Sequence, residues 1–448
     1  MQSPSWNDGP GWHRAEEIVH RVQAPTFPDR DFAVEDFGAL GDGETDCTAA
    51  IAAAMHAAHE AGGGRVVLTE GTYCTGPIQL LSNTNLHVRE GATALFSTDP
   101  DRYLPLVATR WQGVEVMGYS PLVRAADAEN VAITGTGTLD GGAANENWWP
   151  WSGRSIYGWR EGIVAQEDDW PALLDLVRQG IPPEERLVGP GWRFRPNMIE
   201  FLRCRNVWIQ GVTVRRSPMW VIHPVLCTGV LAEDITVISH GPNNDGFDPE
   251  CCTDVVIRRC HFDVGDDSIA IKSGREDDGE RVGVPSRNIV IEDCTMTMKY
   301  GAFTIGSELT GGVSDVYVRN CRIGGPGLYY GLYIKTNAAR GGYVENVYVD
   351  GVEASHLQRE LISCNLHRGE GLDGPRTPVV RNIDIRNVRL GQARRALHVA
   401  GFAHSPVTDL RITDCVFESM TEEDAVSDVV GLVQTNVTRG GPTEGAPS

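Results

Sequence analysis

The sequence predicts an all-β fold, a single-domain right-handed parallel β-helix with an N-terminal capping helix. Two observations carry this prediction: a strand-like segment recurs along the chain, and a small apolar residue recurs at one position within it. The 51 glycines are scattered through the 448 residues, which agrees with many turns between short strands. Repeats of this kind bury their apolar faces only by stacking on one another.

The recurring segment begins with Asn, Asp or Gly and continues with apolar residues two positions apart, the period of a strand with one buried face. Copies begin about 23 to 36 residues apart, at positions 206, 229, 254, 288, 315, 346, 382 and 409, with a weaker copy at 130. Six positions after the start of each regular copy stands a small apolar residue: Val212, Ile235, Cys260, Cys294, Cys321, Val352, Val388 and Cys415. We expect these side chains to stack in one interior row, with strands about 4.8 Å apart. Four of the 11 cysteines are then packing residues, and the lack of a CxxC pair argues against a metal or disulfide framework.

The β-helix is expected to span residues 31–430, after an N-terminal extension (residues 1–30) and before a C-terminal tail (residues 431–448). Residues 36–68 read as strand, turn, helix and strand, with Thr45 or Asp46 capping the helix and Gly62 to Gly64 ending it. This helix is expected to cover the open end of the solenoid. Residues 143–197 form a Trp-rich insertion, whose indoles either stack on sugars or pack as a small satellite core.

The charge balance limits the possible partners. Acidic residues outnumber basic ones by 60 to 39, giving a formal net charge of −21, which argues against a nucleic acid partner. An acidic substrate must be held by a few local cations against this overall field. No run of 18 apolar residues exists, so no membrane span is predicted. The N-terminus lacks the apolar core of a signal peptide, so we expect a cytoplasmic protein, or a secreted or periplasmic one whose leader has been removed.

Carboxylates gather where two successive units enter their second strand. Asp245 follows Asn243 in one unit, and Asp266 and Asp267 occupy the corresponding place in the next. Gly-Asp-Asp-Ser alone is ordinary turn chemistry. Rungs of a β-helix lie about 5 Å apart, however, so carboxylates in register come within reach of one another. Such a cluster favours a carboxylic acid beside a carboxylate, which is the pairing that glycoside hydrolysis needs.

The segments GPNNDGFDPE, VGDDSIAIKSG, YGAFTIGSE and YIKTN, in this order, resemble the polygalacturonase family (glycoside hydrolase family 28). The resemblance extends over residues 31–420 and, through RWQGVEVMGYSPL, GTGTLDGG, RPNMIEF and SPMWVIHPV, points to bacterial, often exo-acting members. It implies a pectin-lyase-like solenoid that hydrolyses α-glycosidic bonds in pectin with inversion and without a cofactor. It also implies that Asp266 is the general acid, that Asp245 and Asp267 activate the water, and that Lys335 contacts a sugar carboxylate.

Two positions depart from the family's pattern. Lys299–Tyr300–Gly301 stands where Gly-His-Gly is usual, and Tyr333–Ile334–Lys335 where Arg-Ile-Lys is usual. The missing arginine removes a bidentate fork for a uronate carboxylate, and a tyrosine at that position favours stacking on a sugar face. Rhamnose or another pectic sugar is therefore an alternative substrate. The cations that could replace the arginine are Lys299, Arg340, Arg359 and Arg368.

The substrate-binding residues expected around the aspartates are Lys335, Tyr333, Tyr300, Lys272, His223, Asn243, Trp220 and Arg340. His223 either lines the cleft or is a satisfied buried histidine, and Glu308 can form a structural pair with a nearby lysine. The expected partner is a pectic oligosaccharide or polysaccharide, cleaved from its end if the insertion closes the cleft. The alternatives are a calcium-dependent polysaccharide lyase and a catalytically silent carbohydrate-binding β-helix.

Overall fold

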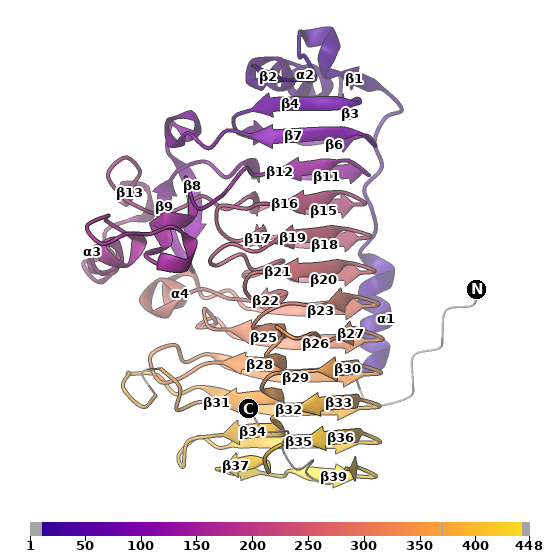
Figure 1. Ribbon diagram of the computed structural model, residues 1–448, viewed down its shortest axis with the longest axis vertical. Coiled ribbons are helices and arrows are strands. Elements are labelled where there is room, and N and C mark those ends of the chain that lie inside the picture. The colour runs from indigo at the N-terminus through magenta and orange to yellow at the C-terminus, as the bar shows by residue number, and fades with distance from the viewer. Residues whose placement is uncertain (1–10, 370, 441–448) are drawn as a thin grey trace. The chain divides into compact units, whose positions relative to one another are not determined.

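The computed structural model describes residues 11–369 and 371–440. The chain divides into two compact units. The N-terminal unit comprises residues 24–250 and 263–266, and the C-terminal unit comprises residues 11–23, 251–262 and 267–440. Each unit is a stack of short parallel strands joined by turns, as the repeat predicts (Figure 1). The chain is therefore built as a parallel β-helix.

The N-terminal unit contains three rows of parallel strands. The first row is β1 (Asp31–Ala33), β3 (Gly64–Leu68), β6 (Thr84–Val88), β11 (Glu129–Gly135), β15 (Arg205–Gln210) and β18 (Thr228–Glu233). The second row is β2 (Asp42–Asp46), β4 (Gly71–Thr75), β7 (Ala92–Phe96), β12 (Thr138–Asp140), β16 (Thr213–Arg215) and β19 (Thr236–Ser239). The third row is β5 (Ile78–Gln79), β10 (Val123–Ala126), β14 (Ile199–Leu202) and β17 (Ile222–Val225).

The C-terminal unit repeats this arrangement. Its first row is β20 (Thr253–Arg258), β23 (Ser286–Glu292), β26 (Val313–Arg319), β29 (Tyr343–Asp350), β32 (Val379–Arg386) and β35 (Val407–Thr413), followed by β38 (Val429–Val430) and β39 (Val433–Thr435). The second row is β21 (His261–Val264, of which His261 and Phe262 belong to this unit), β24 (Thr295–Met296), β27 (Arg322–Ile323), β30 (Glu353–His356), β33 (Arg389–Ala393), β36 (Val416–Met420) and β40 (Thr438–Arg439). The third row is β22 (Ile269–Ile271), β25 (Gly301–Gly306), β28 (Tyr330–Lys335), β31 (Glu360–Asn365), β34 (Arg395–Ala400) and β37 (Ala425–Ser427).

The Asn or Asp that opens each repeat has a backbone role. These residues adopt the left-handed conformation, with φ of 55° at Asn206, 58° at Asn346 and 54° at Asn382. Asn and Asp enter this region more readily than other non-glycine residues. Their side chains also form a ladder, in which Asn382 donates to Asn346 (2.6 Å) and Asn346 donates to Asp315 (3.1 Å). The Asn or Asp at the start of a repeat therefore serves both a left-handed turn and a ladder of side-chain hydrogen bonds.

The predicted interior row is present, and its eight members are buried in their respective units: Val212, Ile235, Cys260, Cys294, Cys321, Val352, Val388 and Cys415. In the C-terminal unit, the Cys294 thiol donates to a main-chain carbonyl two residues earlier. Burial raises the pKa of Cys294 well above its ordinary value, so the group stays a neutral packing side chain. The 11 cysteines, all within the described ranges, form no disulfide.

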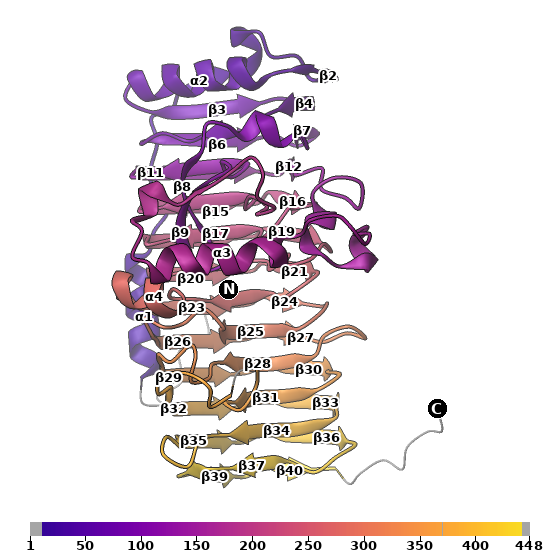
Figure 2. The same ribbon diagram turned by 90° about the vertical axis from the view of Figure 1, so that its left-hand side faces the viewer.

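A helix covers one end of the N-terminal unit. Helix α2 (Thr48–Glu60) lies across the end of the stack beside β3 and buries Ile51 and Met55 (Figure 2). Asp46 accepts hydrogen bonds from the backbone and hydroxyl of Thr48, but the N-cap residue is Cys47, so neither Thr45 nor Asp46 occupies the predicted cap. The helix ends at Glu60, and Ala61 separates it from the glycines. No helix in the described part of the chain is both long and apolar enough to cross a membrane.

The structure adds elements at both ends of the predicted β-helix. Residues 1–30 were expected to be an extension, yet α1 (Trp12–Arg21) docks on the C-terminal unit beside β20 and β23 (Figure 1). Arg21 pairs with Asp254 there. Beyond residue 430, where the tail was expected to begin, β39 and β40 continue the rows. Residues 1–10 and 441–448 lie outside the described residues.

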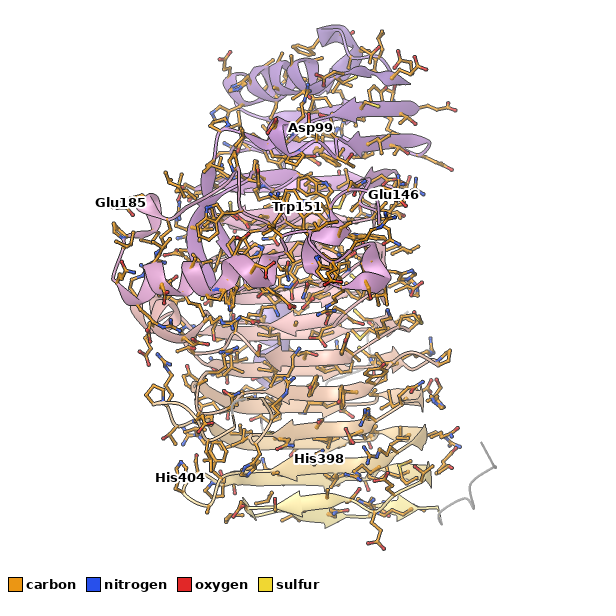
Figure 3. The ribbon with its side chains drawn as sticks, turned by 60° about the vertical axis from the view of Figure 1, so that its left-hand side comes forward. Asp99, Glu146, Trp151, Glu185, His398 and His404 are labelled. Carbon is orange, nitrogen blue, oxygen red and sulfur yellow. The ribbon has the colours of Figure 1, made fainter. Side chains whose placement is uncertain are left out.

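The Trp-rich insertion belongs to the N-terminal unit. It follows an antiparallel hairpin of β8 (Val107–Trp111) and β9 (Val114–Gly118), and it contributes α3 (Gln166–Arg178) and β13 (Leu187–Val188), which pairs with β9. Figure 3 shows Trp151 in front of the strands of this unit and Glu185 at the outer margin of the insertion. An apolar cluster that includes Trp111, Phe194 and Trp220 joins the insertion to the strand rows.

Candidate active site

Two of the three predicted acids meet within the N-terminal unit. A carboxylate oxygen of Asp245 and one of Asp266 lie within 4.8 Å of each other. The two residues are 21 positions apart in sequence, and successive rungs bring them together. The predicted approach of these two acids across rungs is therefore observed. Asp267 follows Asp266 directly in the chain.

Glycine allows this close approach. The backbone of Gly265 donates to the carbonyl of Ser239 (2.7 Å). A Cβ on Gly265 would lie only 2.3 Å from the carbonyl oxygen of Gly241. Any other residue at position 265 would therefore push the segment of Asp266 away from the loop that leads to Asp245.

The loop before Asp245 is held by the buried amide of Asn244. Its oxygen accepts from Ser239 (2.6 Å) and from the backbone of Gly241 (2.8 Å), and its nitrogen donates to the carbonyl of Met219 (2.9 Å). The carbonyl of Asp245 then accepts from the backbone of Val221 (2.9 Å). Asp245 is thus positioned by side-chain and main-chain bonds rather than by a regular strand.

A buried cation that the sequence did not single out lies near this pair. The Arg195 guanidinium is fully buried and donates to Asn243 (2.8 Å) and Gln166 (2.9 Å), and to the carbonyls of Pro218 and Pro242 (both 2.7 Å). Burial lowers the pKa of Arg195 to about 9, while the charge of Asp266 opposes this shift. Arg195 therefore keeps its charge at neutral pH. The only sequence signal for it was its place in the GPGWRFRP segment.

Asp267 is held by donors of the C-terminal unit. Its fully buried carboxylate accepts from the backbone of Gly301 (2.8 Å) and from Nζ of Lys335 (2.5 Å). A Cβ on Gly301 would lie 3.1 Å from the Asp267 oxygen and 3.2 Å from Cβ of Tyr333. These two bonds fix the orientation of the Asp267 carboxylate.

Two predicted substrate-binding cations are committed to ion pairs. Lys272 is buried and lies 3.2 Å from Glu308, which confirms the pair expected for that glutamate. Burial opposes ionisation of Glu308, but Lys272 and Arg275 outweigh it and leave the pKa of Glu308 well below its ordinary value. Arg340 pairs with Glu276. These charges stabilise the C-terminal unit, so Lys272 and Arg340 are corrected from sugar-binding to structural roles.

The predicted sugar-stacking role of Tyr333 is also corrected. Its ring is only 8% exposed, because Tyr330 stacks on it with centroids 4.0 Å apart. Lys335 and Arg368 lie 5.2 and 5.3 Å from the ring centroid. Tyr300, the other tyrosine that departs from the family's pattern, is half-buried and packs edge-on against Tyr329. The ring of Tyr333 therefore supports neighbouring cations and offers no face to a sugar.

His223 was expected either to line the cleft or to be a buried histidine with satisfied hydrogen bonds, and the structure shows the second. Its ring is fully buried, and Nε2 lies 2.9 Å from Glu250 while Nδ1 lies 3.6 Å from Glu200. Burial opposes its protonation, but the bonds to these two glutamates raise the pKa of His223 above its ordinary value. Trp220 is buried against the His223 ring with centroids 4.8 Å apart. Neither residue is available to a ligand, so both are corrected as substrate-binding candidates.

The insertion is anchored to the loop that precedes Asp245. The indole nitrogen of Trp149 donates to the carbonyl of Ser217 (3.0 Å). A Cβ on Gly241 would lie 2.3 Å from the same nitrogen, so the indole packs directly on that glycine. Other indoles of the insertion pack together, as in the edge-on pair of Trp148 and Trp151 with centroids 5.0 Å apart. The satellite-core alternative therefore accounts for much of the tryptophan content.

The model for glycosyl hydrolases family 28 matches residues 190–432. The chain belongs to this family. A crystal structure of a hyperthermoactive exopolygalacturonase from Thermotoga maritima is 42% identical, covers 96% of each chain and superposes with a TM-score of 0.92. This family member also matches, over residues 32–87, a model named rhamnogalacturonase A/epimerase, pectate lyase-like.

Curated relatives agree with the family. A probable polygalacturonase of Vitis vinifera is 27% identical over 85% of this chain and 72% of its own length. An exo-poly-alpha-D-galacturonosidase of Dickeya chrysanthemi is 24% identical over 74% of this chain and 56% of its own length. A family 28 exopolygalacturonase of Yersinia enterocolitica shares the fold, with 18% identity and a TM-score of 0.62 over 92% of this chain. The enzyme is thus a glycosidase of family 28 on a parallel β-helix.

Proposed function

We propose that the protein hydrolyses α-glycosidic bonds of pectin-derived oligosaccharides and releases galacturonate residues from chain ends. The observation that carries this proposal is the approach of Asp245 and Asp266 to within 4.8 Å inside the N-terminal unit. Two carboxylates this close favour a state in which one holds a proton. A proton donor beside a base is the minimum that glycoside hydrolysis requires.

The roles of the three acids follow from the family resemblance and agree with their surroundings. Asp266 donates its proton to the glycosidic oxygen as the bond breaks, and the nearby charge of Arg195 stabilises the carboxylate that remains. Asp267 accepts bonds from Lys335 and Gly301, which hold its carboxylate in one orientation. Asp245 and Asp267 then activate the water that attacks the anomeric carbon.

The distance between Asp245 and Asp266 makes retention of the anomeric configuration a second candidate beside inversion. Carboxyl groups of inverting glycosidases lie roughly 6.5–9.5 Å apart, and those of retaining enzymes about 5–5.5 Å apart. The oxygens of Asp245 and Asp266 fall nearer the shorter range. We propose inversion because the family resemblance implies it and assigns Asp267 as a further carboxylate that activates the water. Retention, with Asp245 as nucleophile, is the alternative. The anomeric configuration of the first product, followed by NMR, separates the two.

The proposal of terminal cleavage rests on the insertion and on the exo-acting relatives. Trp149 packs on Gly241, within four residues of Asp245, so the insertion crowds the approach to that acid. An obstruction on one side of the acids admits a chain end more easily than the middle of a polymer. Release of monomers alone from polygalacturonate is the expected product pattern.

The direct test compares two Asp-to-Asn substitutions in the same segment. Asp266→Asn should lower kcat on trigalacturonate by at least about 10³-fold, because protonation of the leaving group is lost. Asp263→Asn is the matched control, since Asp263 pairs with His240 at 2.9 Å and is partly exposed. Near-normal hydrolysis by Asp266→Asn would overturn the assignment. An unsaturated product absorbing in the ultraviolet would instead indicate a lyase, and binding without turnover would indicate a silent binding protein.

A further inference from the structure

We infer that Arg368 selects sugars with a free carboxylate and that Tyr333 positions its guanidinium for this role. This inference rests on the proposed function, because it names the residue that would recognise the carboxylate of the proposed substrate. It concerns a place where the chain lacks the arginine usual in its family. Tyr333, Lys335 and Arg368 all belong to the C-terminal unit.

Tyr333 is built as a support for cations. Tyr330 covers one face of its ring at 4.0 Å, with an angle of 22° between the ring planes. Lys335 and Arg368 both lie close to the ring centroid, at 5.2 and 5.3 Å. The negative face of the Tyr333 ring attracts the Lys335 ammonium and the Arg368 guanidinium. A planar guanidinium that stacks on a ring keeps its N–H groups for other hydrogen bonds.

The two cations differ in what else they bind. Lys335 is committed to Asp267 at 2.5 Å. Among the residues that the structure describes, Arg368 forms no ion pair, and its guanidinium contacts the Tyr333 ring. Nearby cations such as Arg340 and Arg376 are instead paired with acids of α4 (Glu276–Val282). Arg368 is therefore a partly buried charge whose hydrogen-bonding edge is available to an anion.

The backbone of Arg368 is fixed, so its place is defined. It lies in the turn that follows β31, where its carbonyl accepts from the side chain of Asn337 (3.2 Å) and from the backbone of Gly371 (3.0 Å). Strand β31 pairs with β28, with Ser363 opposite Tyr333. The Arg368 side chain thus extends to the neighbouring rung, where it contacts the ring of Tyr333. Tyr333 stands at the position of the missing arginine, and Lys335 lies two residues after it.

The charge of the whole chain makes such a residue necessary. A net charge of −21 repels an acidic sugar, so recognition must come from local donors. A guanidinium binds a carboxylate through two parallel N–H bonds, which gives both affinity and orientation. The ligand class is therefore a hexuronate with a free carboxylate, and methyl esters and neutral sugars are disfavoured.

The test measures selectivity between an acid and its ester. In Arg368→Gln, KM for trigalacturonate should rise about 10- to 100-fold, the loss expected for a hydrogen bond to a charged group, while kcat changes less than about threefold. KM for its methyl ester, or its inhibition constant if it is not cleaved, should stay unchanged. Arg368→Lys should recover part of the loss. Tyr333→Leu should act like Arg368→Gln on the acid, whereas Tyr333→Phe should not.

Arg322→Gln is the matched control, because it removes one positive charge from an exposed site on β27 of the same unit. Unchanged KM for the acid in Arg368→Gln, or equal losses on acid and ester, would overturn the inference. If wild type cleaves neither substrate, the proposed function fails, and binding of galacturonate to wild type and Arg368→Gln by calorimetry tests the inference by itself. Equal binding by the two proteins would then overturn it.

Discussion

Nζ of Lys335 lies 2.5 Å from Oδ2 of Asp267, and the other oxygen of that carboxylate accepts from the backbone of Gly301. The lysine was expected to bind the substrate, and the structure assigns it first to an acid of the enzyme. Together the two bonds fix the position of the Asp267 carboxylate.

Loss of the Lys335 cation should impair chemistry more than binding. Lys335→Met should lower kcat by about 10²–10³-fold, because Asp267 loses the cation that orients its carboxylate. Lys335→Arg keeps the charge and should retain more activity. Steady-state kinetics on trigalacturonate provide the measurement. A rise in KM with unchanged kcat would show that Lys335 serves the substrate instead.

His223 should make the stability of the N-terminal unit depend on pH. Its pKa is raised above the ordinary value of about 6.5, so the folded protein holds this proton more tightly than the unfolded chain does. The stabilisation is complete below the unfolded pKa and is lost as the pH rises through the folded pKa. The difference in Tm between wild type and His223→Gln, measured from pH 5.5 to 9, should therefore shrink as the pH increases. A difference that is constant with pH would contradict this expectation.

The amide ladder should contribute measurably to stability. Asn382→Ala removes the bond to Asn346. It also places an alanine in the left-handed conformation, at φ of 54°, which alanine adopts less readily than asparagine. The free energy of unfolding should fall by about 1–3 kcal/mol, from the lost bond and the strained backbone together. Asn382→Gly is the control, since it relieves the backbone but removes the same side-chain bonds, those with Asn346, Tyr348 and Arg411. Urea unfolding should rank wild type above Asn382→Gly, and Asn382→Gly above Asn382→Ala.

The contact between Trp149 and Gly241 should influence where the substrate is cut. Trp149→Ala removes the indole that anchors the insertion to the loop before Asp245. Polygalacturonate should then yield dimers and trimers beside the monomer, and the viscosity of its solution should fall faster per bond cleaved. Trp149→Phe keeps a ring and should preserve more of the monomer pattern. Monomers alone from Trp149→Ala would show that other parts of the protein restrict cleavage to chain ends.

The repeat could be predicted from the sequence because each rung obeys local rules. Apolar residues alternate, a small residue follows at a constant position, and Asn or Asp opens the segment. The Asn or Asp at the start of the segment is explained by the left-handed turn and the amide ladder, as at Asn346. The same register predicted that Asp245 and Asp266 would meet, since the distance between rungs is a constant of the fold.

Only the tertiary structure decided which polar residues are free to act. His223, Lys272 and Arg340 are residue types that bind sugars, yet each is occupied by a glutamate distant in sequence. Tyr333 was expected to meet a sugar and instead supports Arg368 and Lys335. Local patterns specify strands and turns, because those depend on neighbours in the chain. The availability of a charge depends on partners that come close only when the rungs stack.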